Sequence, residues 1–400
     1  GSSNKLLFGF EYSYDLNNNI TQLVTKTTDK TVKNKFTFGK DNLPATFTLS
    51  TGKKVDYTYD GLNRLTKTSL TTSTDTPIDT TYTYFASKRG SDYTTTKLKS
   101  ETINGEKYEY KYDAHSNITD VTKDGVLQYH YDYDMMNQLV SVDDKLNGKV
   151  YNYTYDAGGN LISETVTDSN GTTSNAYEYN NSNWGDVLTS YNGQSITYDE
   201  IGNPLTYRDG MSMTWKNGRQ LATFTNGDTS ISYGYDSDSV RTTKTVNGVK
   251  YTYAYLNGQL LYETRGDAKF YYSYDSNGIL YNVRYTLTDG GTEYSYYYTH
   301  NSRGDIVGIY NGAGELKAHY EYDAWGNVIS ITDNNGNVIT NPNHIGNLNP
   351  FRYRGYYQDT ETGLYYLMSR YYDAVTHRFI NADGYFQSGG SILDANTFAY

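Results

Sequence analysis

The amino-acid sequence predicts an all-β protein in which repeated hairpins join into one antiparallel sheet that coils as a spiral. Three observations carry this prediction: tyrosine is unusually frequent, Tyr-Asp pairs recur at a regular spacing, and runs of alternating aromatic residues precede those pairs. The 400 residues include 48 Tyr and 37 Gly but only 5 Pro. Aromatic residues fit pleated, half-buried surfaces and glycine serves tight turns, so strands and hairpins are expected rather than long helices.

Charge, hydropathy and cysteine content exclude several classes of protein. The formal net charge is −11 with scattered Lys and Arg residues, which argues against a nucleic-acid partner. The mean hydropathy is −0.75. No run approaches the roughly 18 apolar residues of a transmembrane helix, so no membrane span is expected. The absence of cysteine excludes disulfides and cysteine metal sites, and it favours a bacterial exported or surface chain.

An internal repeat of about 21 residues extends over nearly the whole chain. Each copy has alternating aromatic residues, a Tyr-Asp pair, a small or polar turn, often an Asn, and an aliphatic residue. Successive pairs at Tyr112, Tyr133 and Tyr155 are 21 and 22 residues apart. The residues that define the repeat are Tyr112, Asp113, Tyr133, Asp134, Tyr155, Asp156, Gly159, Asn160, Tyr198, Asp199, Tyr322, Asp323, Gly326 and Asn327.

Each repeat is predicted to form a β-hairpin. In residues 107–112 tyrosine occupies every second position, which places the rings on one face of a strand. The Asp that follows can accept backbone N–H groups within the turn, and Gly and then Asn tolerate positive φ. Asn-Gly pairs at 147–148, 247–248 and 311–312 are predicted to close the opposite side of the hairpins.

Single hairpins are marginally stable, so the repeats must stack. A continuous, coiling antiparallel sheet gives each tyrosine row neighbours on both sides and leaves few unprotected edges. Such a sheet can close around a packed core or around a cavity, and composition does not choose between them.

The repeated Tyr-Asp-x-x-Gly-Asn-aliphatic unit resembles the YD repeats of the bacterial Rhs (rearrangement hot spot) family, which also occur in wall-associated protein A, toxin-complex C subunits and teneurins. The stretch from 363 to 383 resembles the Rhs-associated core of the same family. The matching core residues are Gly363, Leu364, Tyr365, Tyr366, Arg370, Tyr371, Tyr372, Asp373, Arg378, Phe379 and Asp383. This chain departs from the family at Ala374, His377 and Gly384, where Pro, Gly and Pro are common.

The resemblance implies a hollow β-shell over residues 1–348 and a plug formed by the core segment, residues 349–400. It implies a non-enzymatic function, in which the shell of a bacterial polymorphic toxin sequesters its own C-terminal toxin domain until delivery. The implied location is outside the cell or at the cell wall, with a secretion apparatus as a further partner. The alternative is an adhesion protein that binds cell-surface glycans, because exposed tyrosine rows can stack on sugar rings.

Asp383 is the one candidate for catalysis. The resemblance implies that carboxylates near the end of the core form an aspartic-protease-like pair, whose second member would lie beyond Tyr400. A lone carboxylate cannot share a proton with another, so we expect no catalytic residue in this chain and self-cleavage only in a longer one. A turn residue is the simpler role for Asp383. Arg370 and Arg378 are expected to stack on aromatic rings or form ion pairs.

No metal and no cofactor are expected. The turns at 168–171, 275–278 and 333–336 lack the fifth-position ligand and distal Glu of calcium loops, so they are predicted to be hairpin turns. Asp143 and Asp144 are adjacent in a predicted strand and point to opposite faces, which disfavours a glycosidase pair. The histidines lack metal-site spacing: they are His115, His130, His300, His319, His344 and His377.

Overall fold

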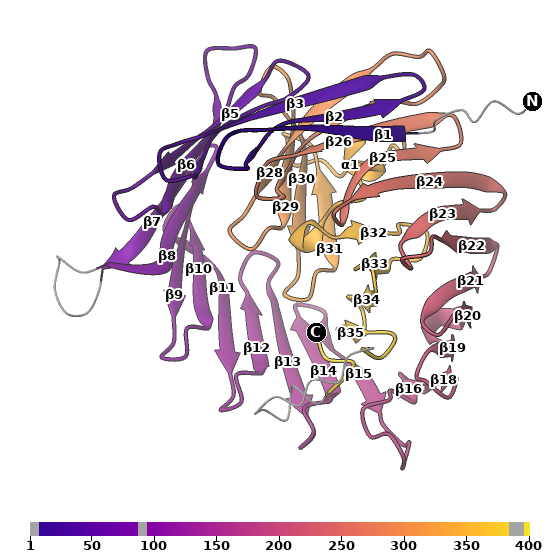
Figure 1. Ribbon diagram of the computed structural model, residues 1–400. Coiled ribbons are helices and arrows are strands. Elements are labelled where there is room, and N and C mark those ends of the chain that lie inside the picture. The colour runs from indigo at the N-terminus through magenta and orange to yellow at the C-terminus, as the bar shows by residue number, and fades with distance from the viewer. Residues whose placement is uncertain (1–7, 87–93, 384–395) are drawn as a thin grey trace, which may run out of the picture. The chain divides into compact units, whose positions relative to one another are not determined.

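The all-β prediction is confirmed. In the computed structural model, which describes residues 8–86, 94–383 and 396–400, strands form nearly all the regular structure (Figure 1). The described helical elements are one short α-helix, α1 (Ile345–Leu348), and two 3-10 turns, η1 (Arg208–Gly210) and η2 (Tyr353–Gly355). Among those residues, no helix is long and apolar enough to cross a membrane.

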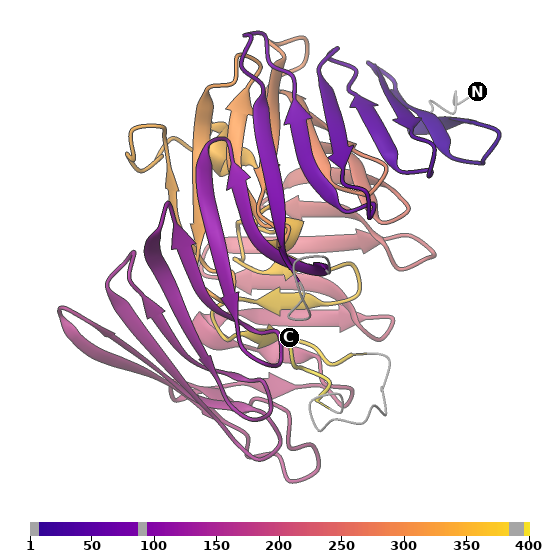
Figure 2. The same ribbon diagram turned by 90° about the vertical axis from the view of Figure 1, so that its left-hand side faces the viewer.

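Consecutive strands pair antiparallel, as expected for stacked hairpins (Figure 2). Within the described residues, the first sheet has 17 strands. They are β1 (Phe8–Tyr14), β2 (Ile20–Thr27), β3 (Thr31–Phe38), β4 (Pro44–Thr48), β5 (Lys54–Tyr59), β6 (Leu65–Leu70), β7 (Ile78–Ala86), β8 (Thr94–Ile103), β9 (Glu106–Tyr112), β10 (Ile118–Lys123), β11 (Val126–Tyr133), β12 (Leu139–Asp144), β13 (Lys149–Tyr155), β14 (Leu161–Asp168), β15 (Gly171–Glu178), β16 (Ser190–Tyr191) and β17 (Gln194–Ser195).

In the part of the chain that the structure describes, the second sheet has 14 strands and the third has four. The second contains β18 (Thr197–Tyr198), β19 (Pro204–Thr206), β20 (Ser212–Lys216), β21 (Gln220–Asn226), β22 (Thr229–Tyr235), β23 (Arg241–Val246), β24 (Val249–Leu256), β25 (Gln259–Arg265), β26 (Ala268–Tyr274), β27 (Leu280–Thr286), β28 (Tyr294–His300), β29 (Ile306–Asn311), β30 (Leu316–Tyr322) and β31 (Val328–Thr332). The third contains β32 (Tyr357–Gln358), β33 (Tyr365–Tyr366), β34 (Tyr371–Asp373) and β35 (Arg378–Phe379).

The chain forms two compact units, each assembled from separate stretches of sequence. Unit 1 contains Gly1–Tyr108, Tyr251–Glu321 and Val328–Gly355. Unit 2 contains Glu109–Lys250, Tyr322–Asn327 and Tyr356–Tyr400. The resemblance implies a different division, with a shell up to residue 348 and a plug after it. That boundary stays a prediction.

The Asp of each repeat organises its turn. Oδ1 of Asp156 accepts the backbone N–H groups of Gly158 and Asn160 at 2.8 and 2.9 Å. Gly159 has the positive φ of 82° that a residue without Cβ adopts freely. The expectation for the Asn was wrong: Asn160 is not among the described residues with positive φ, and its Nδ2 donates to Oδ2 of Asp156 at 3.0 Å. The same amide-to-carboxylate bond forms at Asp15, Asp113, Asp199, Asp323 and Asp333.

The Asn-Gly turns predicted at 247–248 and 311–312 differ from each other in structure. Asn247 and Gly248 both have positive φ, 47° and 86°, as the type I′ hairpin requires. The pair at 311–312 differs from expectation, because Oδ1 of Asn311 accepts the N–H groups of Ala313 and Glu315 and so replaces the repeat Asp.

The Tyr of the Tyr-Asp pair connects neighbouring repeats. The hydroxyl of Tyr155 donates to the carbonyl of Leu139, the aliphatic residue after the preceding repeat turn, at 2.7 Å. A register shift separates Thr154 from Tyr155, so the strand pairing is irregular at this point. Equivalent hydroxyl bonds run from Tyr133 and Tyr235, which belong to other Tyr-Asp pairs, to the carbonyls of Ile118 and Leu221. Tyr84 and Tyr179, which no Asp follows, bond in the same way to the carbonyls of Leu65 and Leu161.

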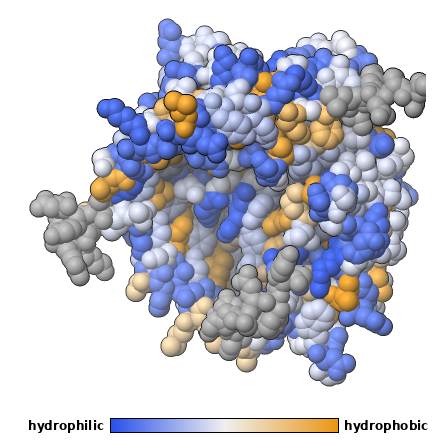
Figure 3. Space-filling view, in the orientation of Figure 1, coloured by the Kyte–Doolittle hydropathy of each residue, from blue (hydrophilic) through white to orange (hydrophobic). Residues whose placement is uncertain are grey.

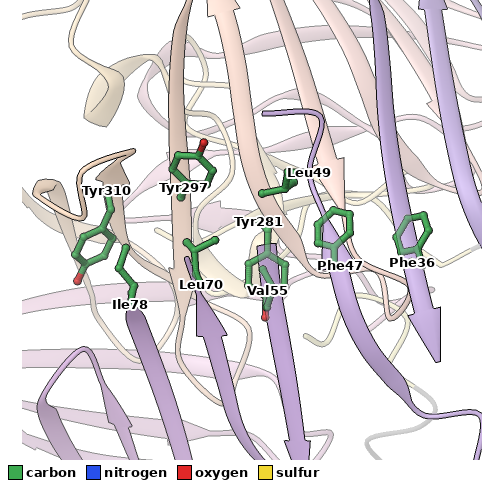
Figure 4. Close-up of a cluster of buried hydrophobic side chains, with 9 residues drawn as sticks. All are labelled: Phe36, Phe47, Leu49, Val55, Leu70, Ile78, Tyr281, Tyr297 and Tyr310. Atoms are coloured by element: carbon green, nitrogen blue, oxygen red, sulfur yellow. The ribbon is translucent and has the colours of Figure 1, made fainter. Parts of the chain in front are cut away.

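The core of unit 1 lies between strands that are distant in sequence. Apolar side chains from β3 to β7 meet tyrosines from β27 to β29 (Figure 4). The cluster comprises Phe36, Phe47, Leu49, Val55, Leu70, Ile78, Tyr281, Tyr297 and Tyr310. Tyrosine therefore supplies buried apolar area, as its abundance predicts. The face drawn in Figure 3 is largely hydrophilic with scattered hydrophobic residues.

Candidate functional site

The C-terminal segment, defined here as residues 356–383, forms a small sheet inside unit 2. Its strands β32 to β35 pair antiparallel in sequence order. Tyr365 and Tyr372 are fully buried, and their hydroxyls donate to the carbonyls of Gly326 and Trp325 at 2.8 and 2.7 Å. The segment is thus packed into the repeat strands of its unit.

A buried ion cluster joins the segment to β23. The guanidinium of Arg241 donates to both carboxylate oxygens of Asp359, at 2.5 and 3.1 Å. Lys244 donates to Asp359 at 2.9 Å and to Glu361 at 2.8 Å. The guanidinium also lies 4.1 Å from the ring centroid of Tyr366. Burial alone would raise the pKa of Asp359, but the positive charges of Arg241 and Lys244 outweigh it and hold that pKa below its usual range.

A second buried pair joins the segment to η1. Arg208 donates to the two carboxylate oxygens of Asp373 at 2.7 and 2.9 Å, in the fork geometry of bidentate pairs. The hydroxyl of Thr376 adds a bond to Asp373 at 3.1 Å and is itself 2.8 Å from the hydroxyl of Tyr207. Asp373 is completely buried, and these partners occupy both of its carboxylate oxygens.

His377 lies in a buried polar cluster beside the same segment. Its ring stacks on Trp325, with centroids 4.6 Å apart and planes 5° from parallel. Nε2 of His377 is 3.8 Å from a carboxylate oxygen of Glu164, and Nδ1 is buried without a hydrogen-bond partner among the described residues. Burial lowers the pKa of His377 to about 3 and raises the pKa of Glu164 to about 7. At neutral pH His377 is therefore uncharged.

The remaining predicted core residues make packing and ion-pair contacts. The guanidinium of Arg370 lies 3.5 Å from the ring centroid of Phe379 and 3.3 Å from the carboxylate of Asp383. Arg378 donates at 2.5 Å to the hydroxyl of Tyr179. Asp383 is partly exposed.

Three further core residues have structural roles. Gly363 has a positive φ of 76° in the turn before β33, and Leu364 is fully buried. The ring of Tyr371 lies 6.3 Å from that of Tyr233 in β22. These contacts tie the segment to the repeats of unit 2.

The sequence motifs do not indicate Arg208, Arg241 or Lys244. One signal was available for Arg241. In the register of the repeat, Tyr155 faces Leu161 and, at the equivalent point, Tyr235 faces Arg241. A charged residue at a position that is otherwise aliphatic and buried requires a buried partner, although the repeat pattern alone does not say which one.

The described geometry defines a class of protein: an all-β repeat protein whose C-terminal segment is fixed by buried ion pairs. The sequence model of the family described as Teneurin YD-shell matches residues 87–392. The chain belongs to this family, which confirms the resemblance to YD-repeat proteins.

Two curated relatives are bacterial nucleases. The tRNA3(Ser)-specific nuclease WapA of Bacillus spizizenii (strain DSM 15029 / JCM 12233 / NBRC 101239 / NRRL B-23049 / TU-B-10) is 38% identical over 245 residues, which are 59% of this chain and 10% of the relative. The tRNA nuclease WapA of Bacillus subtilis (strain 168) is 36% identical over 249 residues, with the same two shares. The chain thus spans about one tenth of the length of these relatives.

Solved structures share the fold at low sequence identity. The crystal structure of TcdB2-TccC3 is 16% identical, with a TM-score of 0.66, and the match covers 97% of this chain and 23% of that one. The structure of a Photorhabdus luminescens Tc holotoxin pore is 15% identical, with a TM-score of 0.63, over 97% of this chain and 22% of that one. These matches show that the fold extends over nearly the whole chain.

Proposed function

We propose that this chain is a segment of the encapsulating shell of a bacterial Rhs-type toxin, which sequesters a C-terminal toxin domain until delivery. The observation that carries the proposal is the C-terminal segment, held in unit 2 by the buried pairs Arg241–Asp359 and Arg208–Asp373. Membership of the YD-shell family supports it. The similarity to WapA proteins also supports it. Their names describe nucleases, and the match covers about one tenth of their length.

The proposed mechanism is containment. Antiparallel strands satisfy one another's backbone groups, so the sheet presents few open edges to an unfolded cargo. The cargo would follow the C-terminal segment in the longer protein, and the buried ion pairs would fix the point where it begins. In this proposal the protein is exported or attached to the bacterial surface, and its partners are its own toxin domain and a secretion apparatus.

We propose no enzymatic activity for this chain itself. Asp383 lies beside Arg370, a contact suited to a structural carboxylate. Self-cleavage in a longer protein would require a second carboxylate close to Asp383. On incubation, purified wild-type protein and an Asp383→Asn variant should each keep the intact mass of the uncleaved chain. A discrete product that forms only in the wild-type chain would refute this part of the proposal.

Containment can be tested by protease protection of the natural full-length product, read through the polypeptide that follows Tyr400. We expect that polypeptide to be cut far more slowly within the full-length product than when produced alone, as followed by mass spectrometry. Asp359→Asn, which removes the carboxylate between Arg241 and Lys244, should reduce the protection. Asp289→Asn is the matched control, because the Asp289 side chain is 82% exposed. If the polypeptide is cut at the same rate within the full-length product as when it is produced alone, containment is refuted.

A further inference from the structure

Residues 396–400 form a turn that resembles the turns of the repeats. Oδ1 of Asn396 accepts the N–H group of Phe398 at 3.1 Å, and the N–H group of Ala399 donates to the carbonyl of Asn396 at 3.3 Å. Asp156 makes the same two bonds in its own repeat turn. The side chain of Asn396 therefore shapes the 396–400 turn locally, as the repeat Asp shapes its turn.

Phe398 differs from the equivalent residues of the repeats in its burial. Two positions after the Asp, three repeat turns carry Leu62, Met136 and Ile201, which are 62%, 49% and 42% exposed. Phe398 is two positions after Asn396 and is completely buried. Turn geometry does not bury this position, so the surroundings of the 396–400 turn must receive the ring.

The ring of Phe398 fills an apolar pocket in unit 2. Val187 and Ala382 are buried against it, and Trp184 packs on it with ring centroids 5.5 Å apart. Gly202 leaves the room for this contact. A Cβ atom at Gly202 would lie 2.7 Å from Trp184 and 3.3 Å from Phe398, so a larger residue would displace one of the two rings.

Polar bonds hold the turn in place around the pocket. The carbonyl of Thr397 accepts the N–H group of Asp383 at 2.9 Å, and the carbonyl of Phe398 accepts that of Phe379 at 3.1 Å. Nδ2 of Asn396 donates to Oδ1 of Asn160 at 2.9 Å. The turn thus bonds both to the C-terminal segment and to a repeat turn.

The bond to Asn160 adds the 396–400 turn to a row of repeat turns. The side-chain amide of Asn117 donates to Asn137, in the next repeat turn, at 2.9 Å. Asn396 makes the same kind of bond to a turn that lies 236 residues away in sequence. A contact that joins successive repeats elsewhere is made here by a distant piece of chain.

Aromatic contacts complete the docking of the turn. The guanidinium of Arg378 lies 5.1 Å from the ring centroid of Phe398 and donates to the carbonyl of Asp186 at 2.5 Å. The ring of Tyr400 stacks on that of Tyr372, with centroids 4.1 Å apart, and Tyr400 is 36% exposed. A buried aromatic anchor, backbone bonds and a stacked ring at the margin are the usual parts of a peptide-recognition site.

We propose that unit 2 recognises residues 396–400 as a docking peptide, with Phe398 as its anchor, and holds them without the covalent connection to Asp383. Asn396 preshapes the turn, which reduces the conformational entropy lost on docking. One consequence rests on the proposed function. A polypeptide that follows Tyr400 stays attached to the shell when the chain is cut between Asp383 and Asn396, and its release requires a cut after Tyr400.

Binding of a separate peptide to the whole 400-residue chain tests the proposal. The chain carries Phe398→Ala, which empties the pocket. The probe is the N-acetylated, C-terminally amidated peptide Asn-Thr-Phe-Ala-Tyr, the sequence of residues 396–400, titrated to millimolar concentration in ligand-observed NMR. We expect saturable binding, at least about fivefold tighter than to wild type, whose own tethered turn occupies the pocket.

Two matched controls accompany the measurement. A peptide with Ala in place of Phe should bind the Phe398→Ala chain at least about tenfold more weakly, because it lacks the anchor. The control protein is Leu62→Ala, which removes an apolar side chain from the equivalent position of an exposed repeat turn. The Phe peptide should bind this protein as weakly as it binds wild type.

Three outcomes overturn the proposal. They are an absence of saturable binding to Phe398→Ala, equal binding of the two peptides, and equal binding of the Phe peptide to Phe398→Ala and to wild type. If Phe398→Ala loses the circular dichroism spectrum of wild type, Asn396→Ala replaces it, because Asn396 is only partly buried. That variant loses the bond to Asn160, so the Phe peptide should bind it at least about threefold more tightly than wild type.

The docking experiment and the containment experiment fail independently. Peptide binding needs no cargo, so its absence would leave containment to be decided by protease protection. Conversely, loss of protection in the full-length product would refute containment while the binding of residues 396–400 to unit 2 could still be measured.

Discussion

At the scale of single residues, Glu164 and His377 respond to the same burial in opposite directions. Burial disfavours whichever form is charged, so it raises the pKa of the acid and lowers that of the base. Nε2 of His377 is 3.8 Å from the Glu164 carboxylate, beyond hydrogen-bond range, so the two groups do not compensate each other as a close ion pair would. Each group should therefore make its own contribution to the pH dependence of the free energy of unfolding.

Glu164→Gln should increase stability at alkaline pH. The pKa of Glu164 is about 7 in the folded chain against an ordinary value of 4.5. The stability that the protonated carboxyl group of Glu164 contributes is complete below pH 4.5 and is lost as pH rises through 7. The variant, which has no charge to bury, should gain about 1 to 3 kcal/mol over wild type at pH 8 and little at pH 4.5. Urea unfolding at the two pH values measures this, and an equal gain at both would contradict it.

His377→Asn should remove a source of acid sensitivity. The pKa of His377 is about 3 in the folded chain against an ordinary value of 6.5. The stability that its neutral ring contributes to the folded chain is therefore present above pH 6.5 and is lost as pH falls towards 3. Asn tolerates the positive φ of 59° at this position. The variant loses the stack on Trp325, so it should be less stable at pH 7. Its stability should nevertheless fall less steeply than that of wild type between pH 6 and pH 4, as measured by urea unfolding.

At the scale of the hairpin, the Tyr and the Asp of the repeat motif have two connected roles. The Asp fixes its own turn through backbone N–H groups, as Asp156 does with Gly158 and Asn160. The Tyr then binds the carbonyl that follows the preceding turn, as Tyr155 does with Leu139. One dipeptide therefore shapes a turn and joins two repeats, which explains why the pair recurs as a pair.

Tyr155→Phe should weaken this connection without changing the packed ring. The carbonyl of Leu139 loses a part-buried donor, so we expect about 1 kcal/mol less stability, up to about 2. Tyr14→Phe is the control, because Tyr14 is 55% exposed and should change stability by only a few tenths of a kcal/mol. Urea unfolding of the two variants compares them directly. Equal losses would indicate that the hydroxyl bond has no special role.

The hairpins could be predicted from sequence because their determinants are local. Alternating tyrosines and the Asp turn act within about ten residues, so strands, turns and the role of Gly159 follow from the pattern. The role of Asn160 was missed, because positive φ and side-chain donation are both ordinary for Asn in turns. In the repeat of Asp275, Ile279 stands where Asn160 stands in the repeat of Asp156, and the second carboxylate oxygen accepts instead from the hydroxyl of Tyr57, 218 positions away. No local rule contains that information.

At the scale of the whole molecule, the candidate site depends on contacts between distant parts of the sequence. Arg241 and Asp359 are 118 residues apart, and Arg208 and Asp373 are 165 residues apart. Family resemblance identified Asp373 as part of the core motif, but it did not identify Asp359. The basic partners of both carboxylates lie among the repeats, where a single basic residue carries no motif. Fold class follows from periodicity, whereas pairing of buried charges follows from tertiary structure alone.

The buried cluster around Asp359 gives the clearest test of how the C-terminal segment is held. Arg241, Lys244 and Asp359 have side chains at most 1% exposed, so removing Asp359 deprives the buried guanidinium of Arg241 of its carboxylate partner, while Lys244 keeps its bond to Glu361. Asp359→Asn should therefore cost about 3 to 5 kcal/mol. A second variant combines Asp359→Asn with Arg241→Met, which removes the uncompensated guanidinium and places an apolar side chain there, while Lys244 keeps Glu361.

The double variant should recover part of the stability lost by Asp359→Asn, because position 241 no longer requires a charged partner. Urea unfolding measures both variants, and limited proteolysis followed by mass spectrometry locates the first cuts. We expect Asp359→Asn to become sensitive within residues 356–383 while the repeat strands stay resistant. The exposed control Asp289→Asn should match wild type in both measurements. A loss below about 1 kcal/mol for Asp359→Asn, the size expected of a surface ion pair, would show that this cluster does not hold the segment.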